Sequence, residues 1–168
     1  IQDANDRCPS GIGENEGWVS TPATDGDEDG CRDNDEDEDD DNDGIVDTYD
    51  LCPGSYGWVS TPSADYDYDG CHDADEDEDD DNDGVADIDD LCPVGRKGWY
   101  SNRYSDWDND GCSDLDEDEN DDNDDHVDGT DACAKGVADW ASDNTTDWDN
   151  DGCQDSTEDE DDDNDGVN

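Results

Sequence analysis

The chain has 168 residues, of which 61 are Asp or Glu and only 6 are Lys or Arg, so its formal net charge is −55. Hydrophobic residues make up 26% of the chain and Phe is absent, which is too little to offset the entropy of ordering one globular core. The charge excludes nucleic acid as a partner, because two polyanions repel, and no apolar run approaches the ~20 residues of a membrane-spanning helix. If the chain folds, something other than a hydrophobic core holds it.

The chain is organised as four repeats of about 40 residues that follow a short N-terminal segment, residues 1–7. Cys-Pro, or Cys-Ala in the fourth copy, begins each repeat, and a connector containing a Gly-Trp or Asp-Trp pair follows. Self-similarity at such a period is typical of repeat proteins, in which each unit contacts its neighbours. Repeats 1 to 4 are residues 8–51, 52–91, 92–132 and 133–168.

Two acidic loops follow the connector in every repeat. Loop A has the pattern D-x-D-x-D-G-C-x-D-x-x-E, and loops A1 to A4 span 25–36, 65–76, 106–117 and 147–158. Loop B has the pattern D-x-D-x-D-G-x-x-D-x-x-D, and loops B1 to B4 span 39–50, 79–90, 120–131 and 161–168. Loop B always begins 14 residues after loop A, whereas the insertions lie in the connector. A solvated acidic tract has no reason to keep such a register, so the spacing indicates a structural role.

Each loop is expected to bind Ca²⁺. Carboxylates at positions 1, 3 and 5, a turn-forming Gly at 6, a carbonyl at 7 and acidic side chains at 9 and 12 can converge on one ion. Ca²⁺ takes about six to eight oxygen ligands, Mg²⁺ prefers fewer protein ligands, and transition metals prefer His or thiolate. The flanks lack the amphipathic helices of an EF-hand. We therefore expect eight or more Ca²⁺ per chain and little regular helix or strand.

The expected ligands are the residues at positions 1, 3, 5, 7, 9 and 12, with position 7 contributing its carbonyl oxygen. In loop A they are Asp25, Asp27, Asp29, Cys31, Asp33 and Glu36; Asp65, Asp67, Asp69, Cys71, Asp73 and Glu76; Asp106, Asp108, Asp110, Cys112, Asp114 and Glu117; and Asp147, Asp149, Asp151, Cys153, Asp155 and Glu158. In loops B1 to B3 they are Asp39, Asp41, Asp43, Ile45, Asp47 and Asp50; Asp79, Asp81, Asp83, Val85, Asp87 and Asp90; and Asn120, Asp122, Asp124, His126, Asp128 and Asp131.

Two loops B depart from the pattern. Loop B3 has Asn120 at position 1 and Asp125 at position 6, where a positive φ suits Gly better, so we expect it to be the weakest complete site. Loop B4 ends after position 8, with Asp161, Asp163 and Asp165 as its ligands.

Residues 1–7 align with 45–51, which places Asp3 and Asp6 at the two acidic positions that loop B4 lacks. Either the chain is a window of a longer array, or subunits associate head to tail and complete one Ca²⁺ site at each junction.

The eight cysteines indicate disulfide bonds. They lie 19 to 23 residues apart, whereas structural zinc sites need cysteine pairs about two to four residues apart. An even number of cysteines in a chain with little core indicates an extracellular or cell-surface protein. The spacing alone leaves the pairing open, with Cys31–Cys52 and its equivalents as one alternative. The cysteines are Cys8, Cys31, Cys52, Cys71, Cys92, Cys112, Cys133 and Cys153.

Residues 39–53, DDDNDGIVDTYDLCP, closely resemble the thrombospondin type 3 repeat, D-x-D-x-D-G-x-x-D-x-x-D-x-C-P. The resemblance covers nearly the whole chain, although the GWVSTP connector differs from the family's usual one. It implies an irregular, elongated, solenoid-like array organised by Ca²⁺ and disulfides, of a kind found in surface and secreted proteins. It also implies the disulfides Cys8–Cys31, Cys52–Cys71, Cys92–Cys112 and Cys133–Cys153.

Other surface features add secondary expectations. Thr21 and Thr61 precede prolines and are candidate O-glycosylation sites, and Asn144 begins the N-glycosylation sequon. The connector tryptophans suit a small local core better than a sugar-stacking platform. Trp107 and Trp148, inside loop A, are expected to point outward.

Together these patterns predict a secreted Ca²⁺-binding structural protein that forms or belongs to an extracellular filament or stalk. The alternative is a Ca²⁺-loaded adhesive module that binds glycan or mineral. An enzyme is not expected, because no dry pocket with two differently tuned catalytic groups is evident.

Overall fold

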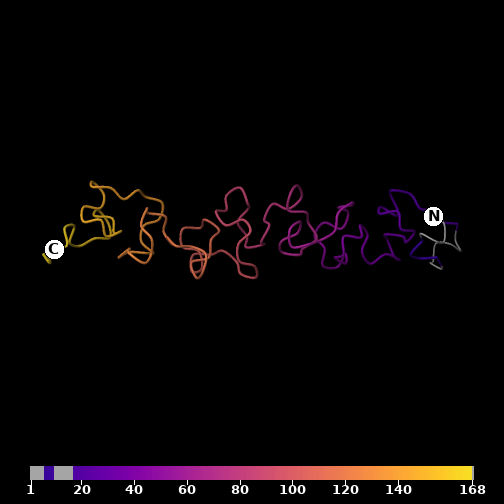
Figure 1. The fold of residues 1–168 in the computed structure, drawn as a ribbon, viewed down its shortest axis with the longest axis horizontal. Helices are drawn as coiled ribbons and strands as arrows, with labels where there is room; N and C mark the ends of the chain where they lie inside the picture. Colours follow the sequence, from indigo (N-terminus) through magenta and orange to yellow (C-terminus); the bar gives the residue numbers. More distant parts are fainter. Residues whose placement is uncertain (1–5, 10–16, 168) are drawn as a thin grey trace. The chain divides into compact units, whose positions relative to one another are not determined.

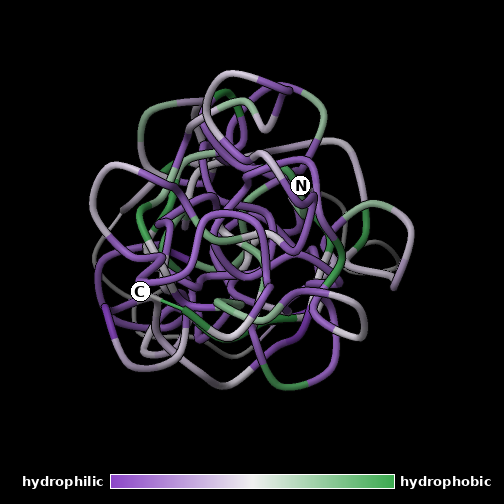
Figure 2. Ribbon diagram, turned by 90° about the vertical axis from the view of Figure 1, so that its left-hand side faces the viewer, coloured by the Kyte–Doolittle hydropathy of each residue, from purple (hydrophilic) through white to green (hydrophobic). Residues whose placement is uncertain are grey.

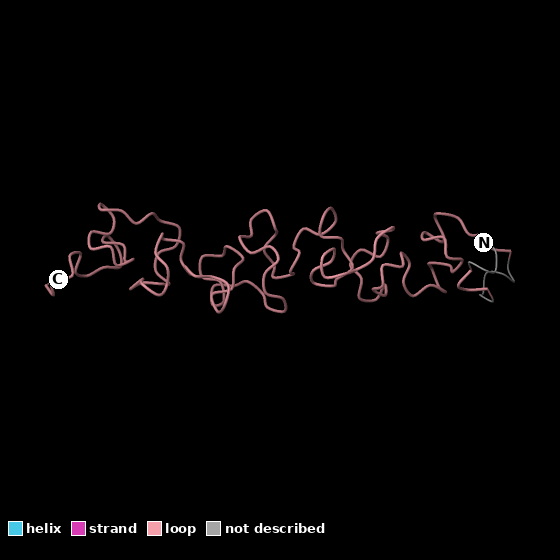
Figure 3. Ribbon diagram, viewed as in Figure 1, coloured by secondary structure: helices cyan, strands magenta, loops and turns pink. Residues whose placement is uncertain are grey.

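The computed structural model describes residues 6–9 and 17–167. Over these residues the chain contains no helix and no strand, and its backbone is a succession of turns and bends (Figures 1 and 3). The irregular fold expected from the sequence is therefore confirmed. No segment within the described ranges forms a helix long and apolar enough to cross a membrane. The chain divides into two compact parts, Ile1–Asp80 and Asp81–Asn168.

Four disulfides fasten the start of each repeat to loop A of the same repeat. They join Cys8 to Cys31, Cys52 to Cys71, Cys92 to Cys112, and Cys133 to Cys153. This is the pairing that the resemblance implied. Each bond closes 19 to 23 residues of chain, and a cross-link over a loop of that length stabilises a fold by about 3 kcal/mol.

A tight turn at the end of each connector delivers the first aspartate of loop A. In repeat 2 the carbonyl of Thr61 accepts hydrogen bonds from the N–H groups of Ala64 and Asp65, both at 2.9 Å. The carbonyls of Thr21, Asn102 and Asp143 accept the corresponding pairs in the other three repeats. The sequence of the turn varies, but its backbone hydrogen bonds do not.

The end of one loop B is bound to the middle of the next loop A. The N–H of Leu51, just after loop B1, donates to the carbonyl of Asp69 at 2.8 Å. Arg7, Leu91 and Ala132 make the same bond to Asp29, Asp110 and Asp151. A glycine is required where these segments meet, because a Cβ on Gly70 would lie 2.1 Å from Asp50 Oδ1. Successive repeats are therefore joined by main-chain hydrogen bonds next to each disulfide.

Loops A and B of one repeat are linked by the asparagine at position 4 of loop B. The Asn42 side-chain amide donates to Asp29 Oδ2 at 3.1 Å, and Asn123 and Asn164 donate to Asp110 and Asp151 at 3.2 Å. These asparagines have φ between 51° and 58°, a conformation that Asn tolerates better than most residues. The link explains why the 14-residue offset between the loops does not vary.

Aspartates occupy the interior that apolar side chains occupy in an ordinary domain. Within residues 6–9 and 17–167, the hydrophobic residues that are buried are four loop A cysteines and Val85, whereas the side chains with less than 2% exposure are nearly all aspartates. Figure 2 accordingly shows hydrophilic residues over most of the trace. Burial of a charge without a compensating partner is strongly unfavourable, so these carboxylates must either take up protons or bind cations.

The tryptophans contribute local packing. Trp58 Nε1 donates to Ser55 Oγ at 2.6 Å, and the Trp58 ring lies 5.0 Å from the ring of His72. The outward orientation expected for Trp107 is wrong, because its Nε1 donates to the carbonyl of Gly136 at 2.9 Å in the next connector. Trp148 is 67% exposed, as expected.

Candidate metal centres

Loop B1 shows how the acidic loops are built. Asp39 Oδ2 accepts the N–H of Gly44 at 3.2 Å, Asp41 Oδ1 accepts that of Asp43 at 3.1 Å, and Asp43 Oδ1 accepts that of Ile45 at 2.7 Å. Each carboxylate thus uses one oxygen to bend the loop. The carboxylates at positions 1, 3 and 5 bring one oxygen each within 4.8 Å of one another, as a metal site requires.

Three other carboxylate oxygens of loop B1 lack hydrogen-bond partners. Asp39 Oδ1, Asp43 Oδ2 and Asp50 Oδ2 are buried and accept no hydrogen bond. Asp50 comes from position 12, and the negative charges of Asp41 and Asp43 raise its pKa. Buried polar atoms in native proteins are nearly always paired, so these oxygens have the positions and chemistry of cation ligands.

Loop B3 repeats the arrangement despite its altered sequence. Its buried oxygens without a hydrogen-bond partner include Asn120 Oδ1, Asp122 Oδ1, Asp124 Oδ2 and Asp131 Oδ2, which represent positions 1, 3, 5 and 12. Asp125 adopts φ = 77°, which confirms that position 6 requires the left-handed conformation.

Loop A uses the same scheme of hydrogen bonds. Position 1 accepts the N–H of the position 6 glycine at 3.2 to 3.3 Å in all four copies. Position 5 accepts the N–H of the loop A cysteine at 2.9 to 3.0 Å, so each disulfide begins on an aspartate-stabilised turn. The oxygens of Asp25, Asp27 and Asp29 converge, as do those of Asp65, Asp67 and Asp69.

Position 9 closes the loop through its own backbone bond. Asp47 Oδ1 accepts the N–H of Asp40 at 2.9 Å, and Asp128 Oδ1 accepts that of Asp121 at 2.9 Å. The equivalent loop A residues, Asp33, Asp73, Asp114 and Asp155, do the same for position 2. One oxygen of each predicted position 9 ligand is therefore already used by the backbone.

The position 12 glutamates of loop A lie against the connector that begins their own repeat. Ser55 Oγ donates to Glu76 Oε2. A Cβ on Gly95 would lie 2.9 Å from both Glu117 Oε1 and Asp81 Oδ2, and one on Gly136 would lie 2.5 Å from Glu158 Oε1. The structure thus places these carboxylates beside position 3 of the preceding loop B.

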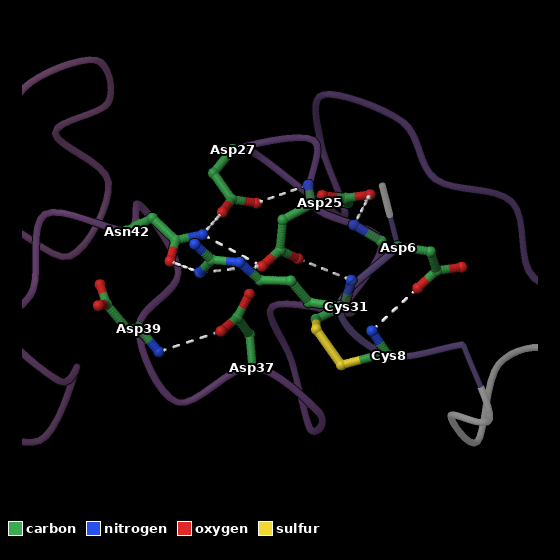
Figure 4. The surroundings of a disulfide bond; sticks show 11 residues. Asp6, Cys8, Asp25, Asp27, Cys31, Asp37, Asp39 and Asn42 are labelled. Atoms are coloured by element: carbon green, nitrogen blue, oxygen red, sulfur yellow. Dashed lines mark hydrogen bonds and ion pairs between the residues drawn. A yellow bond between two sulfur atoms is a disulfide. The ribbon is translucent and has the colours of Figure 1, made fainter. Parts of the chain in front are cut away.

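One set of acidic residues was missed by the sequence prediction. Asp37, Asp77, Asp118 and Asp159 each accept the N–H of the first residue of loop B at 2.8 to 3.1 Å. Figure 4 shows Asp37 near the Cys8–Cys31 disulfide, with one oxygen accepting the N–H of Asp39. Asp37 Oδ2, Asp118 Oδ2 and Asp159 Oδ2 are buried without a hydrogen-bond partner. Their constant place two residues before loop B was the available clue.

The terminal candidates are less enclosed. In loop B4 the N–H of Gly166 donates to Asp161 Oδ2 at 2.7 Å, and Asp163 and Asp165 are exposed. Asp6 Oδ1 accepts the N–H of Cys8 at 2.9 Å and lies beside Gly30, as Asp50 lies beside Gly70. Asp3 lies outside the described residues.

Burial and charge crowding perturb the acidic groups. Burial, together with the charges of Asp110 and Asp118, raises the pKa of Asp108 to about 8. Burial likewise raises the pKa of Asp50 and of Asp122 to about 6, with neighbouring loop carboxylates adding to the effect. Each shift marks a carboxylate whose negative charge lacks a compensating cation.

Comparison with known proteins adds no assignment. No family model matches the chain, and no curated protein matches it.

Proposed function

We propose that this chain is a Ca²⁺-stabilised structural repeat protein of thrombospondin type 3 character that forms part of an extracellular filament or stalk. The single observation that supports it best is the set of buried carboxylate oxygens without hydrogen-bond partners at equivalent positions of loops B1 and B3. Hard oxygen donors in this number suit Ca²⁺. Each ion adds two positive charges to a chain of net charge −55.

Calcium binding and folding are then one process, as in other small metal-organised units. Extracellular modules bind Ca²⁺ with dissociation constants of about 10⁻⁴–10⁻³ M, so external Ca²⁺ at millimolar levels fills them. The four disulfides fit an oxidising compartment. A stack of ion-filled repeats, continued in a longer array or by self-association, would make a stiff spacer.

Small-angle scattering with and without EDTA tests the proposal. We expect the radius of gyration to rise on chelation towards that of an unfolded chain, limited by the disulfides, and to recover when Ca²⁺ is restored. Mg²⁺ at the same ionic strength is the control and should restore compactness less completely. An unchanged radius after full removal of divalent ions would contradict the proposal.

Terbium luminescence offers a site-specific measurement. Trp107 and Trp148 occupy position 2 of loops A3 and A4, so Tb³⁺ bound in these loops would be excited through an adjacent indole. We expect Trp107→Phe to reduce the emission and Trp18→Phe, which changes a tryptophan outside the loops, to reduce it less. Ca²⁺ should displace the bound Tb³⁺.

One observation favours the alternative of a glycan-binding module. Trp99, Tyr104 and Leu115 line a cavity of about 350 Å³ with Arg96 and Lys135 at its edge, and exposed aromatic rings beside polar groups suit saccharides. A glycan array with the Ca²⁺-loaded protein tests this role. Loss of any glycan signal in Trp99→Ala, with Trp18→Ala as the control, would support it.

A further inference from the structure

Lys135 occupies a position between two acidic loops. Its Nζ forms an ion pair with Asp114 Oδ2 and lies 3.1 Å from Asp121 Oδ2. Asp114 is position 9 of loop A3 and Asp121 is position 2 of loop B3, and their side chains are only 5% and 7% exposed. Lys135 belongs to the connector of repeat 4. The lysine therefore neutralises a buried carboxylate pair formed by the loops of the preceding repeat.

Repeat 1 contains the same carboxylates without the lysine. Asp33 and Asp40 occupy the positions of Asp114 and Asp121, and the charges of Asp33, Asp37 and Asp47 act on Asp40. Asp40 Oδ1 and Asp37 Oδ2 are buried and accept no hydrogen bond. In repeat 2 the equivalent Asp73, Asp77 and Asp80 bring one oxygen each within 4.8 Å of one another.

Gly54, in the connector that follows repeat 1, corresponds to Lys135, in the connector that follows repeat 3. The next residue fixes this register, because Ser55 N donates to Asp41 Oδ2 and Gly136 N donates to Asp122 Oδ2, both at 2.8 Å. A Cβ added to Gly54 would have the Tyr56 hydroxyl, at 3.9 Å, as its one neighbour within 4 Å. The connector therefore passes the carboxylate pair in the same way but provides no cation.

We propose that repeats 1 and 2 each hold an additional divalent cation between loops A and B, at Asp33 and Asp40 and at Asp73 and Asp80, and that the Lys135 ammonium replaces this ion in repeat 3. The inference rests on the proposed Ca²⁺ binding. A site with two or three carboxylates leaves several positions to water, which suits a hydrated Ca²⁺ or Mg²⁺. Repeat 3 would thus use an internal ammonium where repeats 1 and 2 use a metal ion.

Two substitutions exchange the roles. Gly54→Lys places an ammonium within reach of Asp33 and Asp40, and Lys135→Met removes the charge but keeps an unbranched apolar stem of similar length. Counting Ca²⁺ per chain by native mass spectrometry should show one ion fewer for Gly54→Lys and one ion more for Lys135→Met. Ser63→Lys and Arg103→Met, which alter exposed connector residues, are the charge-matched controls and should leave the count unchanged.

The outcomes separate the two proposals. A wild-type chain that binds no Ca²⁺ would overturn the proposed function as well as this inference. A wild-type chain that binds Ca²⁺, with counts that do not change in either variant or that change equally in the controls, would overturn the inference alone. Asp40→Asn provides a check that adds no bulk, because it should also lower the count by one while all four disulfides remain intact.

Discussion

Loops B1 and B3 share backbone hydrogen bonds but differ in sequence at five positions, of which positions 1 and 6 belong to the D-x-D-x-D-G pattern. In both loops position 5 accepts the N–H of position 7 at 2.7 Å, and position 9 accepts the N–H of position 2 at 2.9 Å. In loop B1 position 6 is Gly44 with φ = 104°, whereas in loop B3 it is Asp125 with φ = 77°. Asn120 Oδ1 is left unpaired in loop B3, whereas Asp39 Oδ2 accepts the N–H of Gly44 in loop B1.

The difference shows which positions determine the shape of the loop. Positions 5 and 9 make the bonds that both loops share, so they hold the backbone even where position 6 is unfavourable. Positions 1 and 6 affect the Ca²⁺ affinity of the site. An amide in place of a carboxylate lowers the negative charge of the site, and a non-glycine residue at positive φ adds strain of about 1 kcal/mol. Loop B3 should therefore have the same geometry as loop B1 and a lower Ca²⁺ affinity.

The largest expected effect is that Ca²⁺ reverses the pH dependence of the stability of the folded chain. Loops B1 and B3 should contribute to it in the same way. The pKa of Asp50 at the end of loop B1 and that of Asp122 in loop B3 are raised to about 6. Without cations the folded chain therefore binds more protons than the unfolded chain between about pH 4 and pH 6, so its stability falls as pH rises through this range. With Ca²⁺, protons compete for the same oxygens, and acidification lowers stability.

Scattering across pH 4–8, once in EDTA and once in Ca²⁺, measures this reversal. Chain dimensions should grow with rising pH in EDTA and shrink with rising pH in Ca²⁺. Identical pH profiles in the two buffers would show that the carboxylates do not exchange protons for metal.

Loss of position 5 should disable either loop. Asp43 and Asp124 are fully buried, and removing them by Asp43→Ala or Asp124→Ala leaves a backbone N–H without its acceptor, at a cost of about 1–3 kcal/mol, and removes a ligand. Each variant should lose Ca²⁺ from its own loop in calorimetric titration. Asp125→Asn, at an exposed position of loop B3, is the control and should retain the full ion count.

The difference at position 6 can be reversed. Asp125→Gly should strengthen Ca²⁺ binding by loop B3 by about 1 kcal/mol, roughly fivefold, because glycine adopts a positive φ without strain. Gly44→Asp should weaken Ca²⁺ binding by loop B1 by a similar amount. A Cβ at Gly44 meets no other atom within 4 Å, so the strain of a positive φ is the only penalty expected. If the two variants shift Ca²⁺ affinity in the same direction, backbone strain is not what distinguishes the loops.

The smallest effect concerns the link between loops A and B. Asn123→Gly keeps the positive φ but removes the amide that donates to Asp110 Oδ2 at 3.2 Å. We expect a loss of about 0.5–1.5 kcal/mol, the net value of one hydrogen bond, as a modest drop in thermal midpoint in Ca²⁺. Asn123→Ala, which also forces alanine to a positive φ, should lose more; an equal loss would assign the whole effect to the side chain.

Much of the architecture could be predicted from residue spacing. Disulfide bonding, the turn-rich backbone and the positive φ at Asp125 follow from cysteine count, carboxylate repetition and the place of glycine in the loop pattern. Spacing also marks Asp37 and Asn42 as recurring residues, but it could not assign their roles, because these depend on how loop B folds back on loop A. The outward orientation predicted for Trp107 was wrong for the same reason: its partner, the Gly136 carbonyl, comes from the next repeat.

By itself the sequence determined that no apolar interior could form and that acidic loops would recur in fixed register, because composition and local spacing do not depend on distant contacts. Only the tertiary structure decided which carboxylate oxygens face a backbone N–H and which remain buried without one, and that Lys135 pairs with Asp114 and Asp121. These outcomes depend on segments about 20 residues apart lying against one another, and such long-range contacts are set by the folded backbone rather than by any single loop.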